Sequence, residues 1–516
     1  MLATERTRQL AGAAAIVMAA YVCSRLTGVL REIAISYRFG TGPQLDAYNA
    51  AVKVPDIIFQ VVAGAAVTSA FIPVYTRYLA KDEQDQAWEM VRIFFTLALV
   101  VLLPVVLVAM VFAPSLMPLM VPNFTPDYQA LAANLARIVL LSPVFFTLGC
   151  FTTSALNAHH RFLLAALAPT TYNVGIILGA VVLGRSLGVY GLALGALIGS
   201  AGFLLIQVPG LRQIGFAFHP RLDLRHRGVQ AVGRLIGPRA VGLAVAQVNF
   251  LVTLVLASRI RGGISSLNYA WQLTLLPLGI FAMAISTAVF PALAEQGATD
   301  NHSELSQTLL NATRFILYLT IPACIGLVVL SHPIVRLLYQ RGEFTATSTT
   351  MTADALRLYA IGLFGMATTE IVTRAFYALH DTLTPVKVAA LAMVVNLALA
   401  LVLIRTMGEN GLALATALAS TVEAVALFAV AHRRVPGLEV HRLAGSALKS
   451  LAASLLMGAI VLGFIQAAAP LGRPLGGLLL VLGAVAIGGA VYLGVTALLG
   501  SSEVGQLRRL LRRGIS

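Results

Sequence analysis

The chain has 516 residues, of which 58% are hydrophobic and 11% charged, and its mean hydropathy is +0.86. Soluble globular proteins carry about 25% charged residues, so this composition excludes a water-soluble globular protein. The formal net charge of +15 would suggest a nucleic-acid partner in a soluble protein. Here the basic residues lie between and beside apolar runs, where they set membrane topology and meet anionic lipid headgroups. We therefore expect anionic membrane lipids, and no nucleic acid, as partners.

Apolar runs long enough to cross a bilayer recur along the whole chain. A transmembrane helix needs about 20 mostly apolar residues. We therefore predict an all-α integral membrane protein with fourteen transmembrane helices. They are expected at residues 11–37, 45–76, 88–113, 129–157, 162–184, 187–209, 233–258, 265–294, 307–330, 350–379, 384–406, 411–431, 445–467 and 476–499. The first run continues past Ser24 without a clear cleavage site, so we expect a membrane helix and not a cleaved signal peptide.

The distribution of basic residues predicts the orientation. An even number of spans places both termini on one side of the membrane. Loop arginines and lysines are about twice as frequent on the side of the N-terminus as on the other. Because cytoplasmic loops carry the excess of basic residues, we expect both termini to be cytoplasmic.

The two halves of the chain match each other at one constant separation along the sequence, the one that relates position 191 to position 411. The clearest match pairs Gly191-Leu192-Ala193-Leu194 with Gly411-Leu412-Ala413-Leu414, and Arg137 pairs with Arg357. Residues 70–73 resemble 288–291 at nearly the same offset. The alternative is that shared Leu and Ala content alone produces these matches.

A true repeat predicts two six-helix lobes in the same orientation, because six is an even number. Parallel repeats of this kind enclose a central site and alternate its access. We expect an N-lobe at 1–210, a basic cytoplasmic linker at 211–232, and a C-lobe at 233–432. Residues 433–516 then hold helices thirteen and fourteen and a basic tail.

Polar side chains form stripes on the first two predicted helices. The second helix carries five of them at spacings of 3, 4, 3 and 4, which places them on one face. They are Asp46, Asn49, Lys53, Asp56 and Gln60. The first helix carries Ser24, Arg25, Arg31 and Glu32.

A charge near the bilayer centre costs from about 2.5 to over 10 kcal/mol, so these groups need a partner. One interpretation is internal ion pairing, such as Arg25 with Asp46 or Lys53 with Asp56. The other is a water-filled cavity with an anion-binding wall, because arginine forks match phosphate oxygens.

The second half carries less charge at the corresponding positions. Its equivalent stripe, Asn268, Gln272 and Leu275, is uncharged. On another helix Glu370 and Arg374 are four residues apart and are expected to pair with each other. We therefore expect the first half to hold the charged part of the substrate.

Motifs for chemistry in water are missing from the sequence. It contains no Gly-x4-Gly-Lys-Ser/Thr loop, no HExxH and no Cys/His cluster. We expect no enzymatic activity, no catalytic residue, no metal and no cofactor. The energy for transport would come from an ion gradient, the membrane potential or mass action.

Short motifs over nearly the whole chain resemble those of a known transporter family, and the N-terminal block is the most specific. They are Ser24-Arg25-Leu26-Thr27-Gly28-Val29-Leu30-Arg31-Glu32, Phe39-Gly40, Asp46-Ala47-Tyr48, Lys53-Val54-Pro55-Asp56, Ala70-Phe71-Ile72-Pro73, Leu156-Asn157-Ala158, Ala168-Pro169-Thr170 with Asn173, Gln340-Arg341-Gly342-Glu343-Phe344-Thr345 and Thr384-Pro385-Val386-Lys387. On these residues the chain resembles the multidrug/oligosaccharidyl-lipid/polysaccharide (MOP) exporter superfamily and, within it, the MurJ (MviN-type) lipid II flippases.

The resemblance implies two lobes that open alternately to the two sides of the bacterial cytoplasmic membrane. It implies transfer of lipid II, the undecaprenyl-diphosphate-linked peptidoglycan precursor, from the inner to the outer leaflet. It also implies that helices thirteen and fourteen, at 445–499, form a groove for the lipid tail. We expect the protein to work as a monomer.

The resemblance also assigns candidate residues. It implies a cavity lined by Arg25, Arg31, Lys53 and Asp46, with Glu32 where an acidic residue is usual. With Asn49 these are the candidate substrate-binding residues. The gating or structural candidates are Asp56, Pro55, Gln272, Glu370 and Arg374.

The chain departs from the family pattern in three places. Some members carry an arginine and a glutamate in the second helix, where this chain has Phe59-Gln60 and Ala63-Gly64-Ala65. An arginine of the eighth helix is replaced by Gln272. The cavity is therefore less basic than in those members.

Three other functions remain open. A flippase for another polyprenyl-linked glycan would need the same fold and cavity. A cation–drug antiporter of the same superfamily should favour buried carboxylates and aromatic residues over arginines and typically lacks helices thirteen and fourteen. A membrane enzyme acting on polyprenyl lipids would need clustered acidic metal ligands facing the membrane surface, and the sequence shows none.

Overall fold

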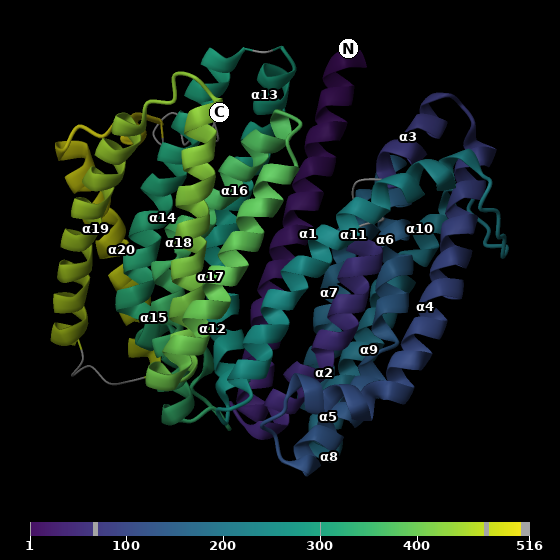
Figure 1. Cartoon of the computed structure of the whole chain (residues 1–516), viewed down its shortest axis with the longest axis horizontal. Coiled ribbons are helices and arrows are strands. Elements are labelled where there is room, and N and C mark those ends of the chain that lie inside the picture. The colour runs from purple at the N-terminus through teal and green to yellow at the C-terminus, as the bar shows by residue number, and fades with distance from the viewer. Residues whose placement is uncertain (1, 65–70, 300, 469–473, 507–516) are drawn as a thin grey trace. The chain divides into compact units, whose positions relative to one another are not determined.

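The computed structural model describes residues 2–64, 71–299, 301–468 and 474–506 (Figure 1). The side chains of 2–19, 21, 63, 64, 233–246 and 474–476 lie outside that description. The described residues form helices joined by turns and loops, and none of them forms a strand. This agrees with the predicted all-α class.

Contacts between helices divide the chain into two units, each described here by itself. The first unit contains residues 1–265 and the loop 341–344. Its helices are α1 (Leu2–Phe39), α2 (Pro43–Phe59), a π-helix (Gln60–Gly64), α3 (Ile72–Ala80), α4 (Gln84–Met120), α5 (Pro126–Val139), α6 (Ser142–Ala158), α7 (Phe162–Leu178), a second π-helix (Gly179–Leu183), α8 (Gly184–Leu187), α9 (Val189–Leu205), α10 (Val208–Gln213) and α11 (Arg227–Ala257).

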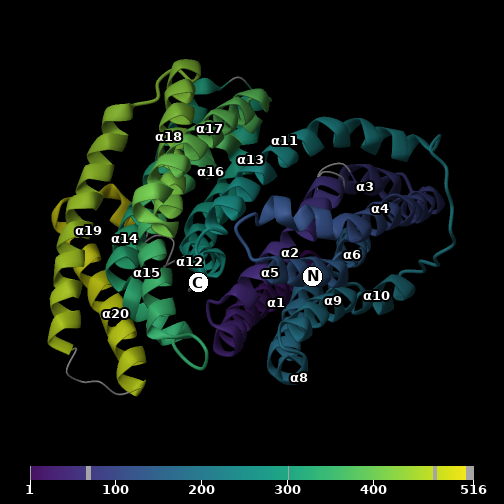
Figure 2. The ribbon, with the colours of Figure 1, turned by 60° about the horizontal axis from the view of Figure 1, so that its bottom comes forward.

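The second unit contains residues 266–340 and 345–516. Its helices are most of α12 (Gly263–Pro277), a π-helix (Leu278–Met283), α13 (Ala284–Ala298), α14 (His302–Tyr339), α15 (Ala346–Ile361), α16 (Leu363–Ala378), α17 (Leu383–Met407), α18 (Glu409–Arg434), α19 (Val440–Ala468) and α20 (Pro474–Leu498). Helices α19 and α20 lie side by side and pack on α14 (Figures 1 and 2).

Among the residues that the structure describes, ten helical segments are long and apolar enough to cross a membrane, and the bent pair α15–α16 makes an eleventh. These eleven coincide with eleven of the fourteen predicted spans. The other three, 11–37, 45–76 and 233–258, each include residues whose side chains the structure does not describe. The count of fourteen therefore stays a prediction.

The same backbone features recur at the offset that the sequence repeat predicts. His160 and His380, which that offset relates, have positive φ angles of 58° and 56°. Gly188 (φ 56°, ψ −136°) precedes α9, and Gly408 (φ 60°, ψ −137°) precedes α18. Both α2 and α12 end in a π-helix, and these begin at Gln60 and Leu278, with the separation that relates 70–73 to 288–291. Composition alone does not produce matched backbone angles, so these features support a structural repeat.

The boundaries of the predicted lobes are a separate matter. Helix α11, predicted to open the C-lobe at 233, packs against α4, α2 and α3 of the first unit. The predicted linker 211–232 comprises the end of α10, an extended segment and the start of α11. Arg221 in that segment forms an ion pair with Glu89 at 2.8 Å, so the segment is fastened to α4. Contact grouping and repeat symmetry are different criteria, and the lobe boundaries remain a prediction.

Glycines allow α7 and α9 to pack with their backbones in close approach. A Cβ atom added to Gly195 would lie 2.5 Å from the Cα of Gly179, and one added to Gly175 would lie 2.4 Å from the Cα of Gly199. Small residues drive this kind of helix pairing in membranes, where the solvent is as apolar as the side chains. The tight pair positions Asn173 of α7 next to α1.

Candidate substrate-binding site

Arg31 on α1 makes the most hydrogen bonds of the predicted site cations in the described part of the chain. It donates from Nε and Nη2 to Glu32 Oε1 at 3.1 and 2.5 Å, and from Nη1 to Asn173 Oδ1 at 3.0 Å. Its side chain is 19% exposed. A guanidinium has five N–H groups, and these bonds use three of them. One N–H on each Nη therefore remains for a ligand.

Asn173 fastens α7 to α1 beside this arginine. Its Nδ2 atom donates to the Ser24 carbonyl at 3.2 Å and to Thr27 Oγ1 at 3.3 Å, while its Oδ1 atom accepts from Arg31. Asn173 is buried. Because a buried amide must have its hydrogen-bonding groups satisfied, Asn173 fixes the guanidinium of Arg31 in place.

Lys53 and Asp56 on α2 continue the charged region. The Lys53 Nζ atom lies 3.9 Å from Asp56 Oδ2 and 5.5 Å from the centre of the Phe250 ring. Asp56 and Tyr172 are also within electrostatic range of Arg31. This bears out the proposed pairing of Lys53 with Asp56. Both side chains stay partly exposed, at 35% and 46%, so the pair remains accessible to a ligand.

Asp46 forms hydrogen bonds with residues at the beginning of α12 and does not pair with Arg25. Its Oδ2 atom accepts from the Gly262 N–H at 2.7 Å, and its Oδ1 atom accepts from the Ser265 N–H at 2.8 Å and Oγ at 2.6 Å. The residue is 1% exposed. A carboxylate at a helix N-terminus satisfies free N–H groups and is stabilised by the helix dipole. Asp46 therefore fixes the first turn of α12.

The polar stripe of α2 faces residues 247–265 along its length. Asn49 Nδ2 donates to Ser265 Oγ at 3.2 Å, and Gln60 Oε1 accepts from Gln247 Nε2 at 2.7 Å. With Lys53 over Phe250 and Asp46 bonded to Gly262 and Ser265, four of the five polar residues contact this segment. The prediction that they share a face agrees with the structure.

The remaining candidates differ in their surroundings. Arg25 is exposed, and no hydrogen bond or ion pair of its side chain is found among the described residues. Pro55 is buried within α2, shortly before the π-helix. Since proline lacks an N–H, it interrupts the regular bonding of α2 just before that change of helix type.

The second-unit candidates form a separate group. Gln272 on α12 is partly buried. On α16, Arg374 donates to Glu370 Oε1 at 2.8 and 3.2 Å, as their spacing predicts, and lies over the Phe290 ring at 6.0 Å. The pair neutralises itself, so it offers no unpaired charge to a ligand.

The sequence did not identify Ser265 or Asn173 as candidate site residues. Asn173 stands in a recognisable motif with Ala168-Pro169-Thr170, which was the available signal. Ser265 follows the glycine pair Gly262-Gly263, a signal for a helix start after a tight turn. Neither pattern reveals which distant side chain the residue contacts.

Fold and site together indicate a polytopic membrane protein with an arginine on α1 that keeps two N–H groups unused. In agreement, the family model "Lipid II flippase MurJ" matches residues 35–478. The chain is 30% identical to the probable lipid II flippase MurJ of Rhizobium meliloti (strain 1021), over 96% of this chain and 94% of that protein. It is also 30% identical to the lipid II flippase MurJ of Burkholderia cenocepacia, over 78% and 80% of the two chains.

Solved structures agree with this relationship. A lipid II flippase MurJ in an inward closed conformation superposes with a TM-score of 0.77 at 26% identity, covering 94% of this chain and 98% of that chain. An inward-facing multidrug resistance MATE family transporter of the MOP superfamily gives a TM-score of 0.70 at 16% identity, covering 82% and 98%, which shows a shared fold alone. The chain belongs to the lipid II flippase MurJ family and is a multi-pass protein of the bacterial inner membrane.

Proposed function

We propose that this protein moves lipid II from the inner to the outer leaflet of the cytoplasmic membrane by alternating access, for peptidoglycan synthesis. Family membership supports this function. The carrying observation is Arg31, a cation on a membrane helix held by Glu32 and Asn173 with two N–H groups left unused. Such a fork suits the oxygens of a diphosphate.

We also propose a division of roles among the site residues. Arg31, Lys53 and the exposed Arg25 contact the diphosphate, and Glu32 orients Arg31. Asp46 and Asn49, which the sequence placed with the substrate, hold the turn 262–265 through the hydrogen bonds described above. These bonds would have to break or re-form whenever α12 moves during transport, so both residues act on gating.

Several finer features of the function remain proposals. Both termini are cytoplasmic, the lobes follow the boundaries predicted from the repeat, and 445–499 holds the lipid tail. The protein is a non-enzymatic monomer without a cofactor, and basic cytoplasmic residues meet anionic lipids. No group of His, Cys, Asp and Glu able to hold a metal is present in the part of the chain that the structure describes. An ion gradient or the membrane potential supplies the energy.

The decisive experiment is depletion of the protein in its bacterium, followed by identification of the lipid-linked precursor that accumulates in the inner leaflet. We expect lipid II to accumulate, and we expect the wild-type gene to restore its transfer to the outer leaflet. Accumulation of a different polyprenyl-linked glycan, with normal lipid II transport, would contradict the proposal and support the nearest alternative. A control strain depleted of an unrelated membrane protein should accumulate neither precursor.

A further inference from the structure

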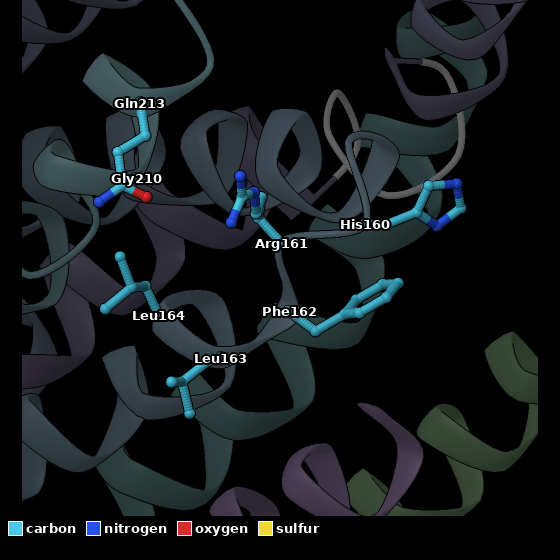
Figure 3. Close-up of a pocket in the computed structure, with 7 residues that line it drawn as sticks. All are labelled: His160, Arg161, Phe162, Leu163, Leu164, Gly210 and Gln213. Carbon is cyan, nitrogen blue, oxygen red and sulfur yellow. The ribbon is translucent and has the colours of Figure 1, made fainter. Parts of the chain in front are cut away.

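We propose that an open pocket at the α6–α7 junction binds the phosphodiester headgroup of an anionic phospholipid. The pocket has a volume of about 400 Å³, within the range of about 300–1,000 Å³ typical of small-molecule sites. His160, Arg161 and Gln213 supply its polar lining, and Phe162, Leu163 and Leu164 supply apolar lining (Figure 3). None of these residues belongs to the site around Arg31.

The polar side of the pocket contains groups that lack partners. Arg161 is exposed, and in the described part of the chain its guanidinium makes no hydrogen bond or ion pair. The side-chain amide of Gln213 is likewise unbonded there. Figure 3 shows Arg161 between Gln213 on one side and His160 on the other. A guanidinium and an amide N–H that face one open space are complementary in charge to a phosphate oxygen.

The location of the pocket identifies its occupant as a lipid. Its residues lie where the membrane helices Pro126–Ala158, Phe162–Leu187 and Val189–Gln213 end or begin, which is the boundary between membrane and water. Its lining also offers apolar surface: Leu163 is 49% exposed. A molecule with an anionic head and an apolar chain satisfies both surfaces at once.

The charge of the pocket favours an ordinary phospholipid over the transported substrate. One guanidinium matches the single negative charge of a phosphodiester. A diphosphate carries more charge and would call for further cations, such as those gathered near Arg31. We therefore assign the pocket to a lipid of the surrounding leaflet, which would anchor the α6–α7 turn at the membrane surface.

Native mass spectrometry of the full-length protein tests this proposal, with phosphatidylglycerol and phosphatidylcholine as probes. Arg161→Gln should weaken phosphatidylglycerol binding about fivefold, the equivalent of about 1 kcal/mol for one basic residue near an anionic surface. Phosphatidylcholine binding should not change. Arg212→Gln is the matched control, since Arg212 is an exposed arginine of α10 outside the pocket lining, and it should bind like the wild type. Equal phosphatidylglycerol affinity of Arg161→Gln and wild type would overturn the proposal.

Two competitors separate the possible sources of phosphate. Neither millimolar inorganic phosphate nor an equimolar amount of lipid II should displace the phosphatidylglycerol that depends on Arg161. Displacement by inorganic phosphate would indicate a free-anion site, and displacement by lipid II would indicate a substrate site; either result overturns the assignment. Because Arg161 has no partner within the described chain, Arg161→Gln should keep the wild-type elution profile, which verifies that it folds.

Discussion

At the scale of single residues, the surroundings of a charge decide its role. Arg31 and Asp46 both sit on apolar helices, where an unpaired charge is costly. Asp46 is fully bonded to the turn at 262–265, whereas Arg31 retains free N–H groups beside its two partners. The first is therefore suited to holding structure and the second to binding a ligand.

We predict that Arg31→Ala abolishes flipping without loss of the protein from the membrane, because it removes the fork that faces the diphosphate. Arg31→Lys should retain only part of the activity, since a compact ammonium lacks the planar fork with which the guanidinium reaches Glu32, Asn173 and a ligand in different directions. Complementation of a flippase-depleted strain, with immunoblotting of membranes, measures both. Normal growth of a strain carrying Arg25→Ala and Arg31→Ala together would contradict the assignment of the cavity.

We predict that Asp46→Asn lowers the thermal stability of the purified protein and its flipping activity. The amide would turn a donor toward N–H groups that need an acceptor, a loss of about 2–3 kcal/mol for a buried, charged hydrogen-bonding group. Asp56→Asn is the control for thermal stability alone, because that carboxylate is 46% exposed and its ion pair contributes about 0–1 kcal/mol. Equal melting temperatures of the two variants would show that Asp46 does not hold α12.

At the scale of helices, polar groups hold the C-terminal pair α19–α20 to α14. The carboxylate of Glu503, just beyond α20, accepts from Ser446 Oγ at 2.7 Å and lies 2.7 Å from Arg314 Nη2. Farther along, Tyr492 donates to the Tyr318 carbonyl at 2.6 Å. Glu503 thus links α14 to α19, and Tyr492 links α14 to α20. They fix the pair at the end of α20, in addition to the apolar contacts among Tyr318, Ala453, Met457 and Val461.

We predict that acidification releases the end of α20. Burial alone would raise the pKa of Glu503, but the hydrogen bond from Ser446 and the charge of Arg314 outweigh it and hold the pKa below its ordinary value of 4.5. A lowered pKa means that this stabilisation is present above pH 4.5 and is lost as the pH falls through the lower folded-state value.

Spin labels on α14 and α20 would measure that release. Glu503→Gln at neutral pH should show the broadened distances that the wild type shows once the pH has fallen below the lowered pKa of Glu503. Glu304→Gln, an exposed glutamate of α14, should behave like the wild type. Identical distances for Glu503→Gln and wild type at neutral pH would rule out this fastening.

We predict that Gly195→Ala strongly reduces the yield of folded protein, because the added methyl group would lie 2.5 Å from the Cα of Gly179, where the second π-helix begins, and 2.6 Å from the carbonyl oxygen of Gly175 in α7. Gly202→Ala on the same helix is the control, since its Cβ would meet Thr171 at an ordinary 3.5 Å. Fluorescence-detected size-exclusion chromatography reports both yields. A normal yield for Gly195→Ala would mean that α7 and α9 are not packed this closely.

At the scale of the whole molecule, the repeat and the topology belong together. Two six-helix repeats place equivalent loops on the same side of the membrane, such as the turns at His160 and His380 with their matching φ angles. The prediction of cytoplasmic termini then fixes the side of every loop. The basic segment 214–226 should face the cytoplasm and the turn before α18 the outside.

We predict that an impermeant maleimide labels Glu409→Cys in intact cells and labels Asp223→Cys only after permeabilisation. The three native cysteines, Cys23, Cys150 and Cys324, are free thiols and can be replaced without breaking a disulfide. The cysteine-free parent controls for background labelling. Labelling of Asp223→Cys in intact cells would invert the topology and exclude cytoplasmic termini.

Much of the fold was predictable because lipid imposes simple rules on a chain. Length and hydropathy located the eleven spans that the structure supports, and helical spacing placed the polar residues of α2 on one face. Spacing also predicted the ion pairs Glu370–Arg374 and Lys53–Asp56, since the two partners of each pair lie on the same helix. Asp46 was different, because its partners belong to a distant segment of the chain, the turn that precedes α12.

The sequence by itself determined the solvent, the helices, the repeat and the family motifs, because each depends on local composition or on periodicity along the chain. Only the tertiary structure decided which of the polar groups are already satisfied. It showed Asp46 bonded to the start of α12, Asn173 bonded to Arg31, and Arg161 without a partner within the described chain. A group's capacity to bind a ligand depends on the hydrogen bonds left unused after folding, and those are set by contacts between distant segments.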